Sequence, residues 1–230
     1  MNEFWKDWPA VFTTPGPALA RLRVRRAWPA ALLLLVLASA LFSFMTFPIQ
    51  KADQAEMIRE SRLAEQFTLD QLEDMSRVSP GQRYFSMFWT GLVVTLVLVF
   101  GTFFVYLFYK VAGAEGLYSD YFTLFVNASL IDVLAGGAVR TLLTLLKGST
   151  QVSTSLAILV PGLAKSSMPY LLLSQFDFFS LWFMFSLALG VAAGLGLSEK
   201  KSLVIMSFYF LFKASIVVLF SYLSLRLLGI

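Results

Sequence analysis

Apolar residues gather in five long stretches of the chain, and polar residues are largely confined to the segments between them. An α-helix rises about 1.5 Å per residue, so roughly 20 apolar residues are needed to cross about 30 Å of hydrocarbon. The stretches that reach this length are 27–47, 84–109, 120–146, 178–197 and 202–226. The pattern therefore predicts an all-α integral membrane protein, in which five transmembrane helices form a bundle and a single membrane domain.

The first 26 residues predict an amphipathic leader, because aromatic and basic side chains alternate in it. We expect it to form an interfacial helix with its rings and cations at headgroup depth. A partner-binding arm is the alternative. The expected interfacial anchors are Trp5, Trp8, Arg23, Arg25 and Arg26.

Two segments between the spans are also predicted to be helical. Segment 48–83 is acidic and carries a capping-box pattern from Thr68 to Gln71, which predicts a small extracytoplasmic insert. It is too short for a core of its own, so it is either a solvated connector or a docking surface. Segment 147–177 contains an apolar stretch shorter than a span, which is typical of an outer interfacial or re-entrant hairpin.

Basic residues next to the spans predict the orientation of the chain. Four arginines precede the first span, and Lys200 and Lys201 lie in the turn before the last one. Both places should face the cytoplasm, which puts the N-terminus inside and the C-terminus outside. We expect a multi-pass protein of the cytoplasmic (inner) membrane. The first span resembles a secretory signal, but its length favours retention as a transmembrane helix.

Composition narrows the function classes. The chain is 58% apolar with a mean hydropathy of +0.74, so membrane lipids are its main surroundings. It has no Cys and no His, which excludes disulfides, thiolate or imidazole metal sites and His-assisted catalysis. No nucleotide-binding, dinucleotide-binding or calcium-binding motif is present. We therefore expect no enzyme activity, no cofactor, no metal and no nucleic-acid partner.

Two charged residues stand at the middle of predicted spans. Asp132 and Lys213 each lie 12 residues after the charged residue that begins the span, so both should be roughly 18 Å deep. A lone charge there costs about 2.5–3.5 kcal/mol, and pairing relieves much of that cost. We expect an intramembrane ion pair between them, structural rather than part of a proton or substrate relay. Asn127 and Arg140 should widen this polar stripe.

The fourth predicted span offers a packing face. Gly190 and Gly194 form a small-xxx-small pattern that lets another backbone approach closely. We expect a seam within the bundle, to which Gly136 and Gly137 of the third span could contribute. A docking site for another protein is the alternative.

Several stretches together resemble the Yip family of integral membrane proteins, first known as partners of Rab-type GTPases. They are Val11–Pro15 before a basic segment, the loop Gly113–Gly116, Phe176–Trp182 at the start of the fourth span, and Gly190–Ser202. The resemblance covers nearly the whole chain. It implies a non-enzymatic bundle of five transmembrane helices, and the acidic insert is similar to the bacterial branch. Asn127 and Asp132 depart from the apolar third span that the family leads one to expect.

Two functions follow from these expectations. The resemblance implies an accessory or scaffold subunit of a membrane complex, plausibly with an ABC exporter that works with a periplasmic adaptor. The alternative is a carrier or scramblase that handles a small solute or lipid headgroup along the stripe of Asp132, Arg140 and Lys213. The first is favoured, because no inverted pair of broken helices is evident in the sequence. Cargo and partner stoichiometry stay open.

Overall fold

The computed structural model describes residues 4–61, 67–160, 162–164 and 166–228. Within these residues, five helical stretches are long and apolar enough to cross a membrane. They are α3 (Trp28–Glu60), α5 (Pro80–Val111), the run from α6 (Tyr118–Ala128) to α7 (Gly137–Lys147), α9 (Phe178–Leu195) and α10 (Glu199–Leu228). The predicted all-α class and the predicted number of spans are thus confirmed.

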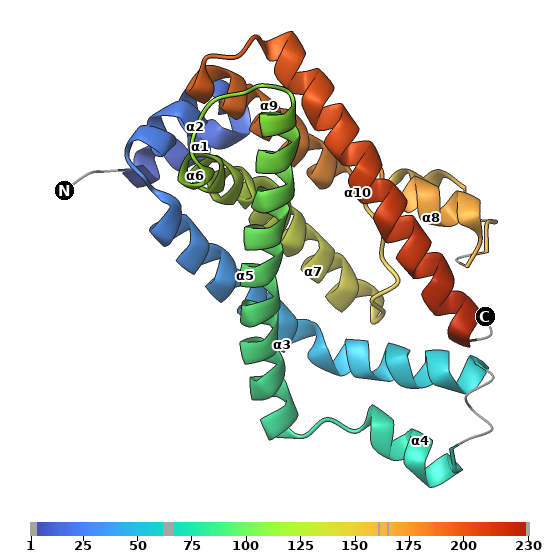
Figure 1. The fold of residues 1–230 in the computed structure, drawn as a ribbon. Coiled ribbons are helices and arrows are strands. Elements are labelled where there is room, and N and C mark those ends of the chain that lie inside the picture. The colour runs from blue at the N-terminus through green and yellow to red at the C-terminus, as the bar shows by residue number, and fades with distance from the viewer. Residues whose placement is uncertain (1–3, 62–66, 161, 165, 229–230) are drawn as a thin grey trace.

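Two ends of the bundle are distinguished in Figure 1, where α2 (Pro15–Val24) and α4 (Leu69–Ser76) lie far apart. We call them the α2 end and the α4 end. The two ends are connected by α3 and α5, which pack side by side. The predicted capping box is confirmed, since Thr68 and Gln71 exchange side-chain and backbone hydrogen bonds at the start of α4. Residues 62–66 of the predicted insert lie outside the described residues.

The first spanning helix is longer than its apolar run. It continues through Pro48 to Glu60, although the predicted span ends at residue 47. Residues 49–60 are polar but favourable for helix, so the helix outlasts the part that hydropathy marks. Figure 1 shows α3 turning across the lower end of α5. An internal proline such as Pro48 is the usual cause of such a bend.

The third span is interrupted at its centre. Between α6 and α7 the backbone forms a π-helical segment, Leu130–Gly136, which contains Asp132. Such segments are rare inside α-helices and are frequent at functional sites. The wider turn also changes the direction in which the following side chains point. The faces of α6 and α7 therefore do not continue one another as in a regular helix.

The chain then folds back without another long helix. After α7 come a short 3-10 helix at Leu156–Leu159 and α8 at Met168–Ser174, and Ser155 forms an isolated bridge with Asp177. α9 starts beside the middle of α10. The ring of Phe176, just before α9, lies 5.3 Å from the ring of Phe210 in α10. Non-helical backbone therefore reaches the level where the spans are most apolar, which bilayers tolerate only when protein or a water-filled cavity surrounds it.

The leader packs into the bundle instead of turning its apolar face to lipid. It consists of a 3-10 turn (Phe4–Asp7), α1 (Trp8–Thr13) and α2. Leu19 and Leu22 of α2 are fully buried. A side-chain carbon at Gly190 would lie 2.5 Å from Leu19, so the glycine makes room for α2. Gly190 of α9 therefore packs against the leader, and not against Gly136 or Gly137.

Candidate functional site: a charge cluster beside a polar cavity

Arg140 of α7 holds two carboxylates at once. Its Nη2 donates to Oδ1 of Asp132 at 2.9 Å and to the Asp132 carbonyl at 2.8 Å, and its Nη1 donates to Oδ1 of Asp177 at 3.2 Å. Asp132 lies in the π-helical segment, and Asp177 immediately precedes α9. Charge-assisted hydrogen bonds of this kind are strong and directional. The guanidinium therefore connects the broken middle of the third span to the start of the fourth.

Both carboxylates are also held by neutral donors. Ser180 donates its hydroxyl to Oδ2 of Asp132 at 3.1 Å. Asp177 caps α9 by accepting the backbone N–H groups of Phe179 at 3.0 Å and Ser180 at 3.1 Å, and it accepts the Thr154 hydroxyl from the folded-back segment. A carboxylate suits this position because it satisfies free N–H groups and complements the helix dipole.

Lys213 belongs to the same neighbourhood without the predicted direct contact. Both Asp132 and Asp177 lie near enough to act electrostatically on its ammonium group. Among the described residues, however, no carboxylate oxygen lies within 4.0 Å of its nitrogen. Arg140 takes the direct position because its planar fork reaches two carboxylates, which an ammonium cannot match. We call Asp132, Arg140, Asp177 and Lys213 the charge cluster; its two positive and two negative side chains balance.

A polar cavity of about 350 Å³ lies next to Arg140, between α3, α5 and α7. One wall is a stripe along α3, formed by Ser39, Ser43, Thr46 and Gln50. Gln50 lies 11 residues after Ser39, so the stripe is roughly 16 Å long. It runs from the middle of the bundle toward the α4 end. A volume of this size can hold about ten water molecules.

The other walls of the polar cavity are polar as well. α5 contributes Thr90, whose hydroxyl donates to Ser43 at 2.9 Å, and α7 contributes Thr141 and Thr144 beside Arg140. The segment after α7 closes one side, where the Thr150 backbone N–H donates to Asp53 of α3 at 2.6 Å. Hydroxyl groups both donate and accept hydrogen bonds, so this lining can bind water or the polar part of a ligand.

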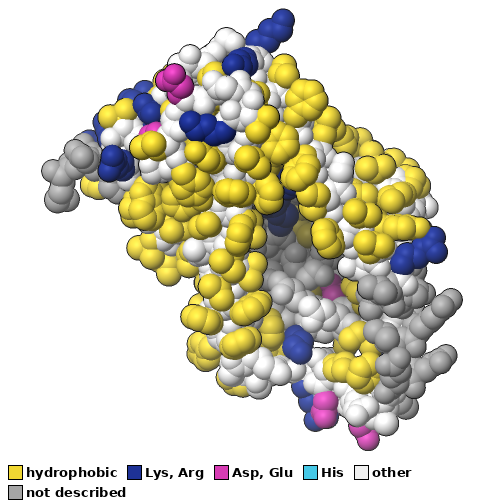
Figure 2. All heavy atoms as spheres, in the orientation of Figure 1, with side chains coloured by type: hydrophobic (Ala, Val, Ile, Leu, Met, Phe, Trp, Pro, Cys, Tyr) yellow, Lys and Arg dark blue, Asp and Glu magenta, His cyan; other side chains and the backbone are white. Residues whose placement is uncertain are grey.

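The molecule is hollowed on the face that carries α5 and α10. Figure 2 shows this face covered mainly by apolar side chains, with a hollow near its centre in which a basic side chain is visible. The apolar surface around the hollow is suited to contact with the hydrocarbon of a bilayer. The exposed rings at the α4 end of α5 are those of Tyr84, Phe85, Phe88 and Trp89. Aromatic rings of this kind are enriched where a bilayer meets water.

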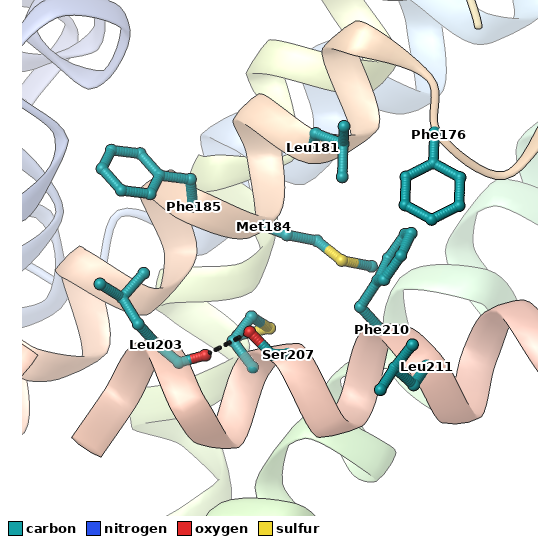
Figure 3. A pocket seen from close by; sticks show the side chains of 9 residues that line it. Phe176, Leu181, Met184, Phe185, Leu203, Ser207, Phe210 and Leu211 are labelled. Carbon is teal, nitrogen blue, oxygen red and sulfur yellow. Dashed lines mark hydrogen bonds between the residues drawn. The ribbon is translucent and has the colours of Figure 1, made fainter. Parts of the chain in front are cut away.

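A second cavity, between α9 and α10, has a different character. It has a volume of about 330 Å³ and an almost entirely apolar lining, with Met184, Phe185 and Phe210 among its residues (Figure 3). The Ser207 hydroxyl at its edge donates to the Leu203 carbonyl of its own helix at 2.9 Å. This groove offers shape for an acyl chain but no polar recognition, so the polar cavity is the better candidate site.

Asn127 does not join the stripe of Asp132 and Arg140. Its side chain is fully buried and accepts the Trp8 indole N–H at 3.1 Å, while its amide donates to the Thr123 carbonyl at 2.9 Å. The π-helical segment separates Asn127 from Arg140 and turns them to different sides. Trp8 therefore contacts a polar group inside the bundle, whereas the sequence predicts it at headgroup depth.

The remaining predicted anchors differ among themselves. Arg23 pairs with Asp120 at 3.4 Å and Arg25 pairs with Asp7 at 2.9 Å, so both hold the leader to the protein. Arg26 is exposed and has a positive φ of 50°, and the Trp5 side chain is 44% exposed. Their place at a membrane interface stays a prediction.

The polar stripe of α3 is the part of the site that sequence reasoning missed. Its members recur at spacings of four, three and four residues, which places them on one helix face. Hydropathy averages hide such a stripe because Ser and Thr are only mildly polar. Asp177 was missed for another reason: it lies outside every apolar run and reaches the cluster only because the chain folds back before α9.

Together these features define a multi-pass α-helical membrane protein with a polar cavity and a balanced charge cluster within its spans. A family model described as the Yip1 domain matches residues 10–222. The chain therefore belongs to the Yip1-domain family, in agreement with the resemblance seen in the sequence. Comparison with curated proteins and with solved structures gives no match.

Proposed function

We propose that this protein is a non-enzymatic carrier that holds the polar part of a small molecule or lipid inside the membrane. The observation that carries the proposal is the polar cavity of about 350 Å³, which meets the charge cluster within the spanning bundle. Polar and ionisable groups at this depth are costly, and they generally mark binding sites or pathways. The sequence allows this carrier function as the alternative to an accessory subunit.

The broken elements around the cluster support the same function. Asp132 lies in the π-helical segment, and Asp177 caps a helix that starts beside the middle of α10. In many transporters, interrupted helices near the midplane supply the substrate site. Here they supply the two carboxylates that Arg140 holds. The site is therefore built where two of the spans depart from a long regular helix.

Transport by reconstituted protein tests the proposal. In liposomes, wild-type protein should accelerate the movement of either a fluorescent phospholipid or the neutral polyol sorbitol. Replacing both Thr141 and Thr144 by Val keeps the side-chain volume but removes two cavity hydroxyls, and we expect at least a five-fold loss of rate. Thr123→Val is the matched control, because Thr123 is equally buried but lies outside the cavity. Wild-type rates equal to those of protein-free liposomes would refute a carrier function.

A second candidate is an accessory subunit of a membrane complex. The observation in its favour is the α4 region, which stands at the edge of the bundle (Figure 1) and carries exposed acidic residues. Among the residues that the structure describes, Glu73 and Asp74 form ion pairs only with the exposed Arg77 of the same segment. The family resemblance suggests an ABC exporter in a bacterial inner membrane, with the α4 end and the C-terminus outside. Stoichiometric recovery with an exporter, lost on Glu73→Gln with Asp74→Asn, would support this function.

A further inference from the structure

We infer that the ligand of the polar cavity is a phospholipid with a zwitterionic headgroup, which enters sideways from the leaflet at the α4 end. The inference rests on the proposed function and specifies its substrate. Three features of the molecule carry it: a gap between α5 and α10, a polar stripe behind that gap, and the balance of charges at its deep end.

Within the described residues, the hydrogen bonds and ring contacts between α5 and α10 lie near the α2 end. There the Tyr109 hydroxyl lies 2.6 Å from the Ser202 hydroxyl, and the rings of Phe104 and Phe212 are 5.8 Å apart. Closer to the α4 end, no hydrogen bond or ring contact joins these two helices within the described part of the chain. Figure 1 shows them diverging in that direction. Figure 2 shows that the face which carries these two helices is hollowed, and a lipid chain can occupy this hollow without leaving the hydrocarbon.

The polar stripe behind the gap offers a path for a headgroup. It begins with Gln50 toward the α4 end and reaches Ser39 and Arg140 in the middle of the bundle. The polar cavity lies between α3, α5 and α7, and Figure 2 shows a hollow with a basic side chain in it on the face that carries α5. A molecule that is polar at one end and apolar at the other fits both surfaces at once. A free polar solute uses the stripe but leaves the apolar gap unfilled.

The charge cluster selects the kind of headgroup. Arg140 and Lys213 are balanced by Asp132 and Asp177, so a ligand with a net charge would leave an uncompensated charge deep in the bundle. A zwitterionic headgroup adds no net charge. Its phosphate can approach Arg140, which lines the polar cavity, while its ammonium group turns toward the two carboxylates that Arg140 binds. Anionic phospholipids lack the second of these contacts.

Headgroup access can be measured with single cysteines, because the natural chain has none. Ser39→Cys places a small fluorescent label on the polar stripe, and Leu41→Cys places it about 3 Å away along α3 on the exposed side. The probe is phosphatidylcholine with a nitroxide on its headgroup, in nanodiscs. We expect at least three-fold stronger quenching at Ser39 than at Leu41. Ser43→Cys with Met45→Cys gives a second pair if the first variant does not fold.

Competition and a soluble probe separate the outcomes. Excess unlabelled zwitterionic lipid should relieve the quenching at Ser39, and excess anionic phosphatidylglycerol should not; equal relief by both would overturn the headgroup selection. If a water-soluble nitroxide quenches the label but the lipid nitroxide does not, the cavity takes a solute. In that case the lipid inference fails and the proposed function stands. If neither probe reaches the label, both fail.

Discussion

Replacing Arg140 by Met should destabilise the protein by about 2–4 kcal/mol. The substitution keeps an apolar stem but leaves the carboxylates of Asp132 and Asp177 without their direct partner. Breaking a fully buried pair costs about 3–5 kcal/mol, and we expect somewhat less because the Arg140 side chain is 35% exposed. Unfolding in mild detergent measures the loss. Arg77→Met is the control, because Arg77 is exposed and its ion pairs should contribute less than about 1 kcal/mol.

A double-mutant cycle then separates the direct contact from the nearby one. Asp132→Asn combined with Arg140→Met should show a coupling energy of at least about 1 kcal/mol. Asp132→Asn combined with Lys213→Met should show less, because Lys213 acts on Asp132 without an ion pair inside 4.0 Å. Equal coupling in the two cycles would mean that Lys213 and not only Arg140 binds Asp132 directly, as the sequence alone predicts.

Asp177→Ala should cost about 2–4 kcal/mol, and Asp177→Asn should cost clearly less. Alanine removes the cap of α9, a partner of Arg140 and the acceptor of the Thr154 hydroxyl. Loss of a cap alone costs about 1 kcal/mol. Asparagine keeps a capping oxygen, so it removes mainly the charge. The same unfolding measurement distinguishes them, and equal losses would show that Asp177 acts through its charge alone.

The sequence predicts the membrane architecture because long apolar runs are read directly against bilayer thickness. It also predicts the start of α4, since the Thr68–Gln71 capping box is local. Helix ends beyond the bilayer are less visible, and α3 therefore runs past residue 47 to Glu60. The leader is placed less well, because an amphipathic helix looks the same whether its apolar face meets lipid or, as at Leu19, another helix.

The site depends on tertiary structure to a greater degree. Depth along a regular helix puts Asp132 and Lys213 at one level, but it cannot show that Arg140 and not Lys213 takes the direct contact with Asp132. The π-helical segment changes the angle between Asn127 and Arg140, and helical-wheel reasoning does not include that change. Asp177 reaches the cluster only through the folded-back segment. The π-helical segment and the folded-back segment are backbone irregularities that composition and periodicity do not encode.

Polar molecules should reach the middle of the bundle through the polar cavity. Thr144→Cys and Thr123→Cys test it directly in nanodiscs, with the rate of reaction toward a small water-soluble thiosulfonate as the measurement. Both positions are buried, but only Thr144 lines the cavity. We predict at least ten-fold faster modification at Thr144. Equal, slow rates at the two positions would contradict the account.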